Sequence, residues 1–115
     1  MNALEFAGLG RIQKELEPIT GLKVKYHSLT AKEEKEILHV LSQSLQDLGA
    51  RSSVLVIETL VRAIESIGDR TFNDVKDLRE YLENLQRPAI STLWDSFQKE
   101  IDQESNKKID ELKKN

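Results

Sequence analysis

The chain has 115 residues, the size of one domain, so a second independent domain is not expected. Seventeen Lys and Arg against twenty Asp and Glu give a net charge of −3, which offers phosphates no positive field and disfavours nucleic-acid binding. The chain has no cysteine, which excludes disulfides, thiol nucleophiles and cysteine-based metal sites. With 32 % charged residues and only two prolines, the composition indicates a charged helical domain.

The sequence predicts neither a signal peptide nor a membrane span. Glu5 and two glycines interrupt the first apolar residues, where a signal peptide would have a continuous apolar core. The longest uninterrupted apolar run, Val54 to Ile57, is far shorter than the roughly 20 residues that a membrane helix needs. We therefore expect no membrane partner.

The N-terminal arm, residues 1–21, is predicted to contain a short helix. Leu9, Ile12 and Leu16 stand at positions i, i+3 and i+7, which lie on one face of a helix. Pro18 would end that helix, because proline lacks the backbone N–H.

The pattern changes after this arm to that of an extended segment. Leu22, Val24 and Tyr26 alternate with two lysines, as in a half-exposed strand. A lone strand is predicted either to cover the helices or to pair with a strand of another chain.

The first long helix is predicted over residues 31–48. Thr30 and Glu33 form a capping box at its start, and Gly49 supplies the left-handed residue that would end it. Its apolar residues recur at helical spacing: Ile37, Leu38, Leu41, Leu45 and Leu48.

The next helix is predicted to follow Ser52 and Ser53, which can cap it, and to end at Gly68. It is the most apolar helix of the chain and is expected at the centre of the core, where each fully covered Ile or Leu contributes about 1.5–3 kcal/mol. Its apolar face consists of Val54, Ile57, Leu60, Val61, Ile64 and Ile67.

A third helix is predicted from the pair Thr71 and Asp74, which resembles a capping box, to about Gln86. Its inward side chains would be Phe72, Val75, Leu78, Leu82 and Leu85, with Tyr81 beside them.

Pro88 suits the first turn of a fourth helix. The apolar stripe of this helix consists of Ile90, Leu93, Trp94, Phe97 and Ile101. Residues 102–115 are mostly charged, and they are predicted to extend this helix away from the domain or against another molecule. The expected fold is an all-α bundle of about four helices, with an arm (1–21), a helical domain (22–101) and a charged extension (102–115).

Two groups of residues have the composition of a metal site, but neither has the spacing. His27 and His39, with Glu33, Glu34 and Glu36 between them, lack the H-x-x-x-H or H-E-x-x-H pattern of zinc sites. The stretch from Asp69 to Glu80 places oxygen-bearing side chains at EF-hand positions, but Asp74 stands where the loop needs glycine. Surface histidines and helix capping are the preferred interpretations.

No arrangement for catalysis or cofactor binding is recognised. The serines form no G-x-S-x-G motif, and the five glycines form neither G-x-G-x-x-G nor a phosphate-binding loop. Lys107, Lys108, Lys113 and Lys114 suit the C-terminal end of a helix better than a nucleic-acid surface, because acidic residues surround them. We expect a protein that is not an enzyme and has no cofactor or metal.

Three runs of the sequence carry a resemblance to a known family: YHSLTAKEEKEIL (26–38), LVRAIESIG (60–68) and FNDVKDLREYL (72–82). With the segments between them, over about residues 22–100, the chain resembles the small helical tail assembly chaperones and related baseplate proteins of tailed bacteriophages.

The resemblance implies a non-enzymatic protein of the host cytoplasm that binds the tape-measure and tail-tube proteins during assembly and associates with copies of itself. Two alternatives stay open. One is a permanent virion subunit of the baseplate, tail or connector, and the other is a cytoplasmic helical module for protein interaction or regulation.

The residues predicted to contact partners lie at the ends of the apolar stripes. They are Leu22, Val24 and Tyr26 on the extended segment, and Trp94, Phe97, Ile101, Ile109 and Leu112 on the last helix. Core packing is the alternative for Trp94 and Phe97, because a long helical stripe normally faces the interior of its own domain.

Overall fold

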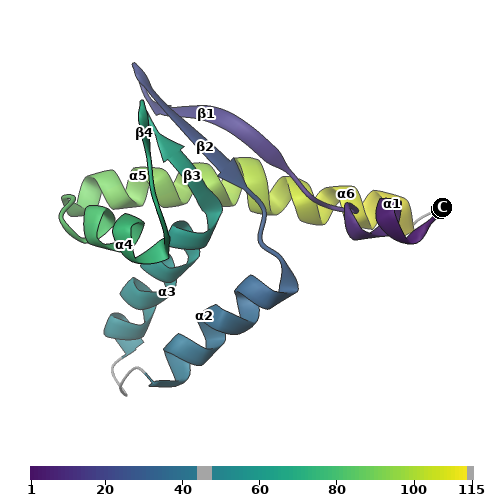
Figure 1. Cartoon of the computed structure of the whole chain (residues 1–115), viewed down its shortest axis with the longest axis horizontal. Coiled ribbons are helices and arrows are strands. Elements are labelled where there is room, and N and C mark those ends of the chain that lie inside the picture. Colours follow the sequence, from purple (N-terminus) through teal and green to yellow (C-terminus); the bar gives the residue numbers. More distant parts are fainter. Residues whose placement is uncertain (44–47, 114–115) are drawn as a thin grey trace.

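The chain folds into an antiparallel sheet covered on one face by helices, so the predicted all-α bundle is wrong. In a computed structural model, which describes residues 1–43 and 48–113, four strands pair in the order β1-β2-β3-β4 (Figure 1). The strands are β1 (Gln13–Ile19), β2 (Leu22–His27), β3 (Ile64–Ile67) and β4 (Arg70–Thr71). The helices are α1 (Ala3–Ala7), α2 (Ala31–Gln43), α3 (Leu48–Ala63), α4 (Val75–Glu83), α5 (Arg87–Phe97), the π-helical turn η1 (Gln98–Asp102) and α6 (Gln103–Lys113).

The helical face predicted through Leu9, Ile12 and Leu16 is wrong, because residues 13–16 belong to strand β1 and the short helix of the arm is α1, further toward the N-terminus. Ile12 and Leu16 are four residues apart, and a separation of four keeps two side chains on one face of a strand as well as of a helix. The half-buried residues continue at Pro18, with the period of two that a strand requires. Gly21, with a φ of 88°, then turns the chain back into β2.

The extended segment over residues 22–26 is confirmed as strand β2. It lies inside the sheet, hydrogen-bonded to β1 on one side and to β3 on the other. Val24 and Tyr26 are fully buried, whereas Lys23 and Lys25 point to the exposed face. The partner strands that β2 needs therefore come from the same chain.

The helix predicted to run to Ile67 ends at Ala63, and its last four residues form β3. Ile64 and Ile67 are three residues apart, a spacing that suits one face of a helix. In a regular strand it would place them on opposite faces, yet both are buried. A β-bulge explains this, because Lys25 pairs with Ser66 whereas the next residue, Tyr26, pairs with Ile64. The extra residue lets both isoleucines face the core.

The capping box that begins α2 is confirmed. The Glu33 N–H donates to the Thr30 hydroxyl at 3.2 Å, and the Thr30 N–H donates to the Glu33 carboxylate at 2.9 Å. The predicted C-terminal end of this helix is different, because α2 is described to Gln43 and Gly49 lies inside α3. The predicted position Leu45 lies outside the described residues.

The start of α4 is set by Asp74, and Thr71 belongs to β4. The Asp77 N–H donates to the Asp74 carboxylate at 2.8 Å, which makes Asp74 the N-cap. The helix ends at Glu83, short of the predicted Gln86. As predicted from Pro88, the next helix begins at residue 87.

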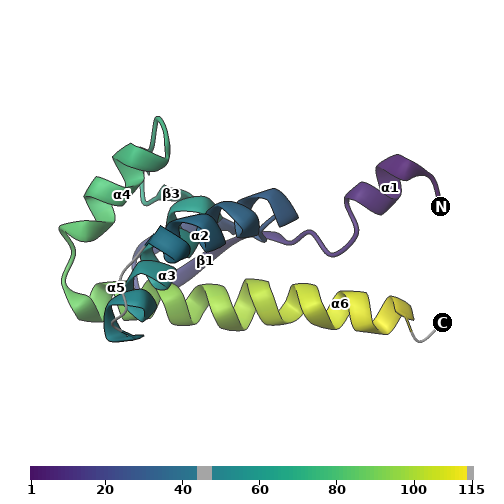
Figure 2. The same cartoon turned by 90° about the horizontal axis from the view of Figure 1, so that it is seen from below.

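The segments α5, η1 and α6 form one long helix along the molecule (Figure 2). Its inner residues are spaced by four: Leu93, Phe97, Ile101, Ser105 and Ile109. Each step of four residues in an α-helix overshoots a full turn by roughly 40°. The wider π-helical turn takes up this excess and keeps the later residues on the inner face.

The C-terminal part of this helix packs on the N-terminal segment of the same chain. The Ser105 hydroxyl donates to the Gly10 carbonyl, and the side chain of Ile109 lies over Gly10. Residues 103–113 therefore have a contact inside the chain that the sequence did not predict.

The core lies between one face of the sheet and helices α3, α4 and the long C-terminal helix. Its buried members are Val24, Tyr26, Leu60, Val61, Ala63, Ile64, Ile67, Leu78, Leu82, Leu93, Phe97 and Ile101. The other face of the sheet is polar, with Lys23 and Glu15 3.9 Å apart on neighbouring strands.

We expect Gly10→Ala to lower the free energy of unfolding by about 1–2 kcal/mol, because Gly10 has a left-handed φ of 81°. An added Cβ would also lie 3.0 Å from two carbons of Ile109. Urea unfolding measures the effect. In the matched control Gly8→Ala, φ is −87° and an added Cβ would meet only the Glu5 carbonyl oxygen, at an ordinary contact distance of 3.8 Å, so stability should stay within about 0.5 kcal/mol or rise. Equal losses in both variants would contradict the packing described.

Candidate functional site

The eight residues predicted to contact partners divide into two groups by exposure. One group is buried in the core, with at most 2 % of any residue exposed: Val24, Tyr26, Phe97 and Ile101. The other group keeps exposed surface: Leu22, Trp94, Ile109 and Leu112. Of these, Ile109 lines a hollow beside the N-terminal segment, and Trp94 borders a hollow on each side of α3.

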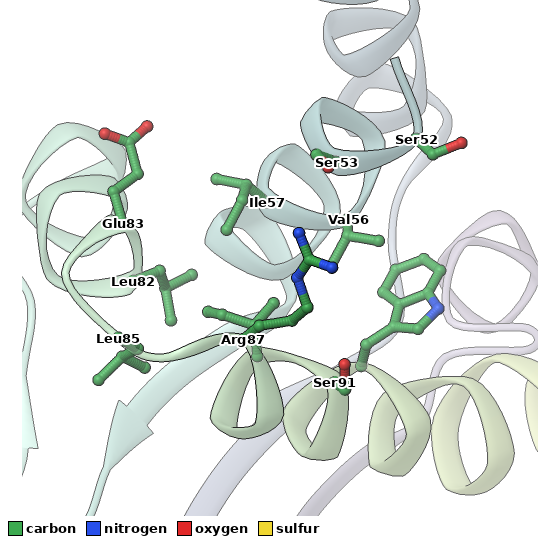
Figure 3. Close-up of a pocket in the computed structure, with 11 residues that line it drawn as sticks. Ser52, Ser53, Val56, Ile57, Leu82, Glu83, Leu85, Arg87 and Ser91 are labelled. Carbon is green, nitrogen blue, oxygen red and sulfur yellow. The ribbon is translucent and has the colours of Figure 1, made fainter. Parts of the chain in front are cut away.

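The first hollow has a volume of about 480 Å³ and lies between the N-terminal half of α3, the end of α4 and the start of α5 (Figure 3). Its walls are mostly apolar, and the figure shows Arg87 extending from α5 toward Val56 of α3, while the Glu83 carboxylate points away. Its lining residues are Ser52, Ser53, Val56, Ile57, Leu82, Glu83, Leu85, Arg87, Ile90, Ser91 and Trp94.

The second hollow, of about 330 Å³, lies on the other side of α3, between α2, α3 and the junction of α5 with η1. Leu38 and Leu55 at this hollow are 65 % and 38 % exposed, respectively. The lining residues are Leu29, Glu34, Ile37, Leu38, Leu55, Thr59, Trp94, Phe97, Gln98 and Asp102. This is where the folded body exposes large apolar side chains beside a concave surface.

Each helix around the second hollow contributes two residues that are four apart in sequence. These pairs are Glu34 and Leu38 on α2, Leu55 and Thr59 on α3, and Gln98 and Asp102 on η1. Residues four apart lie on one face of a helix, so each of these helices presents one face to the hollow.

The charge around the second hollow is negative. Glu34 and Asp102 line it from different helices, and neither has an ion-pair partner among residues 1–43 and 48–113. The residues that line this hollow include no Lys, Arg or His. The two carboxylates are therefore available to a positively charged partner.

A buried ionic cluster around Glu58 of α3 joins three of the helices beside the two hollows, α2, α3 and α4. Arg79 of α4 donates from two nitrogens to the Glu58 carboxylate at 2.7 and 2.8 Å, and Arg62 donates to it at 3.0 Å. The Arg62 Nε has no hydrogen bond, but it lies 3.8 Å from Glu36 of α2. Sequence analysis missed this cluster, although an acid and a base four residues apart on the most apolar helix were a visible signal.

The pKa of Glu58 is set by two opposing effects. Burial alone would raise the pKa of this carboxyl, but the hydrogen bonds and charges of Arg79 and Arg62 lower it below its ordinary value. The same interaction raises the pKa of the Arg79 guanidinium. The charged form of the cluster is therefore the stable one in the folded protein.

The two groups considered for metal binding have other roles. The Nδ1 of His27 lies 2.8 Å from the Ser28 carbonyl, and His39 is exposed on α2. Asp69 lies in the turn between β3 and β4, while Asp77 accepts the Asn73 N–H at 3.3 Å. Within the described part of the chain, no three His, Asp or Glu side chains are placed to hold one metal ion.

Comparison of the chain with known protein families, with curated proteins and with solved structures gives no match. In the segments that the structure describes, no helix is both long and apolar enough to span a bilayer.

We expect Glu58→Gln to lower the free energy of unfolding at pH 7 by about 2–3 kcal/mol, because two guanidinium groups lose their counter-charge. Since the pKa of Glu58 is lowered by folding, its stabilisation is present at neutral pH and is lost as the pH falls below the ordinary value of 4.5. The wild type should therefore lose more stability than the variant between pH 7 and pH 3 in urea unfolding.

The control for this prediction is Glu80→Gln, which removes an exposed carboxylate of α4 without a salt bridge in the described part of the chain. It should change the stability at pH 7 by less than about 0.5 kcal/mol. An identical acid dependence in wild type and Glu58→Gln would show that the cluster does not contribute as described.

Proposed function

We propose that this protein is a non-enzymatic binding protein that holds another protein at the second hollow. The observation that carries this proposal is the concave surface between α2, α3 and η1, where Leu38 and Leu55 are exposed. Exposed apolar residues gathered at a concave site are typical of interaction surfaces.

We propose further that the binding serves the assembly of a bacteriophage tail in the host cytoplasm. The support is the resemblance of residues 22–100 to tail assembly chaperones. On this proposal the partners are the tape-measure and tail-tube proteins, and the protein associates with copies of itself while it holds them.

A permanent virion subunit is the second candidate, and a specific observation favours it. Both termini lie at one end of the molecule (Figure 2), where α1 exposes Leu4 and Phe6 by 84 % and 68 % and α6 exposes Leu112 by 43 %. A projecting end with apolar side chains suits a contact between subunits of a particle. Mass spectrometry of purified particles separates the two candidates, because a transient assembly factor should be missing from them.

We expect Leu38→Gln to weaken partner binding roughly tenfold without unfolding the chain, because burying an exposed leucine stabilises a complex by about 1–2 kcal/mol. Co-expression with a tape-measure or tail-tube protein, followed by affinity measurement on the purified complex, tests this. The matched control is Val75→Gln, an exposed apolar residue on α4, which should bind as the wild type does.

Two results would count against the proposal. A chain that stays monomeric and binds neither protein would remove the assignment to tail assembly. Wild-type affinity of Leu38→Gln for a partner that does bind would move the binding surface away from the second hollow.

A further inference from the structure

We infer that the second hollow binds an amphipathic helix of a different protein, one that carries Lys or Arg beside its apolar residues. The inference rests on the proposed function and adds the chemistry of the segment that binds.

The apolar part of this surface suits a helix. Phe97 and Ile37 are buried beneath it, Trp94 is half-buried, and Leu38 and Leu55 are exposed. Three helices surround the hollow, so the surface is a short groove between rigid walls. A partner helix places apolar anchors at positions i, i+3 or i+4, and i+7 into a groove of this kind.

The polar part of the surface selects the charge of that helix. Glu34 on α2 and Asp102 on η1 both line the hollow, and in the described structure neither is neutralised by an ion pair. A helix with Lys or Arg next to its apolar residues would meet a carboxylate from each of these two helices. A helix with Glu or Asp at those positions would be repelled by both.

A second copy of this chain is a poorer occupant, although its α1 is apolar and exposed. Leu4 and Phe6 are the anchors that α1 could insert, but Glu5 lies between them in sequence. The segment Ala3–Ala7 contains no Lys or Arg. Charge therefore favours a helix from another protein over the N-terminal helix of this one.

The experiment uses the full chain and two synthetic 18-residue peptides with the same helical leucine stripe. One peptide has Lys at the polar positions that flank the stripe, and the other has Glu there. Trp94 is the single tryptophan of the protein and borders both hollows, so its fluorescence reports binding at either one, and the variants described next decide between them. We expect saturable binding of the Lys peptide, roughly tenfold tighter than that of the Glu peptide, and a smaller difference at high salt.

A pair of charge-reversal variants locates the effect. Glu34→Lys with Asp102→Lys should invert the preference between the two peptides. Asp69→Lys with Glu80→Lys makes the same change in net charge at exposed positions that do not line the hollow, and should keep the wild-type preference.

Three outcomes would overturn the inference, and they leave different parts of the proposed function standing. Equal binding of both peptides removes charge selection but keeps the hollow as an apolar site. An equal loss of preference in both double variants shows attraction by net charge alone. Binding of neither peptide removes helix docking, and the proposed function then stands only if the co-expressed complex is still weakened by Leu38→Gln.

Discussion

The burial of Tyr26 is the interaction on which the rest of the structure depends. Its ring is fully buried, its centroid lies 6.4 Å from that of Phe97, and its hydroxyl donates to the Leu93 carbonyl at 3.1 Å. Burial raises the pKa of this phenol to about 12, although a hydrogen bond with Ser96 opposes the shift. These contacts join β2 to α5, the first part of the long C-terminal helix. With Leu93 and Phe97 turned to the sheet, Trp94 follows roughly 100° around the helix and borders the two hollows beside α3.

The sequence was a good guide to local features and a poor guide to the sheet. The capping box of α2 and the start of α5 at a proline depend on residues within one turn of each other, and both predictions are confirmed. Strand β3 depends on pairing with β2, which is distant in sequence, whereas β1 pairs with β2 in a local hairpin and was missed for another reason. The separation of four between Ile12 and Leu16 fits either period, and the bulge in β3 gives Ile64 and Ile67 the spacing of a helix.

In the candidate site, too, the sequence predicted local features and missed those that depend on distant segments. Trp94 was among the predicted contact residues, because it lies on an obvious apolar stripe. The acidic character of the second hollow was not predictable, since Glu34 and Asp102 are far apart in sequence and ordinary in their surroundings. The constant spacing of four residues from Leu93 to Ile109 did contain a signal for the π-helical turn. In a regular α-helix, side chains at that spacing would shift progressively away from the inner face, and the wider turn of η1 returns them to it.

The order of the elements along the chain has a consequence for folding during synthesis. The hairpin of β1 and β2 is made before the helices that cover it and can form at once, because its strands are joined by a tight turn. The side chains that cover Tyr26 and Val24 include Leu93, Phe97 and Ile101, from the last quarter of the chain. The apolar face of the hairpin therefore stays uncovered while the ribosome makes the intervening residues. A nascent chain in that state exposes the kind of surface that leads to aggregation, and completion of the C-terminal helix removes it.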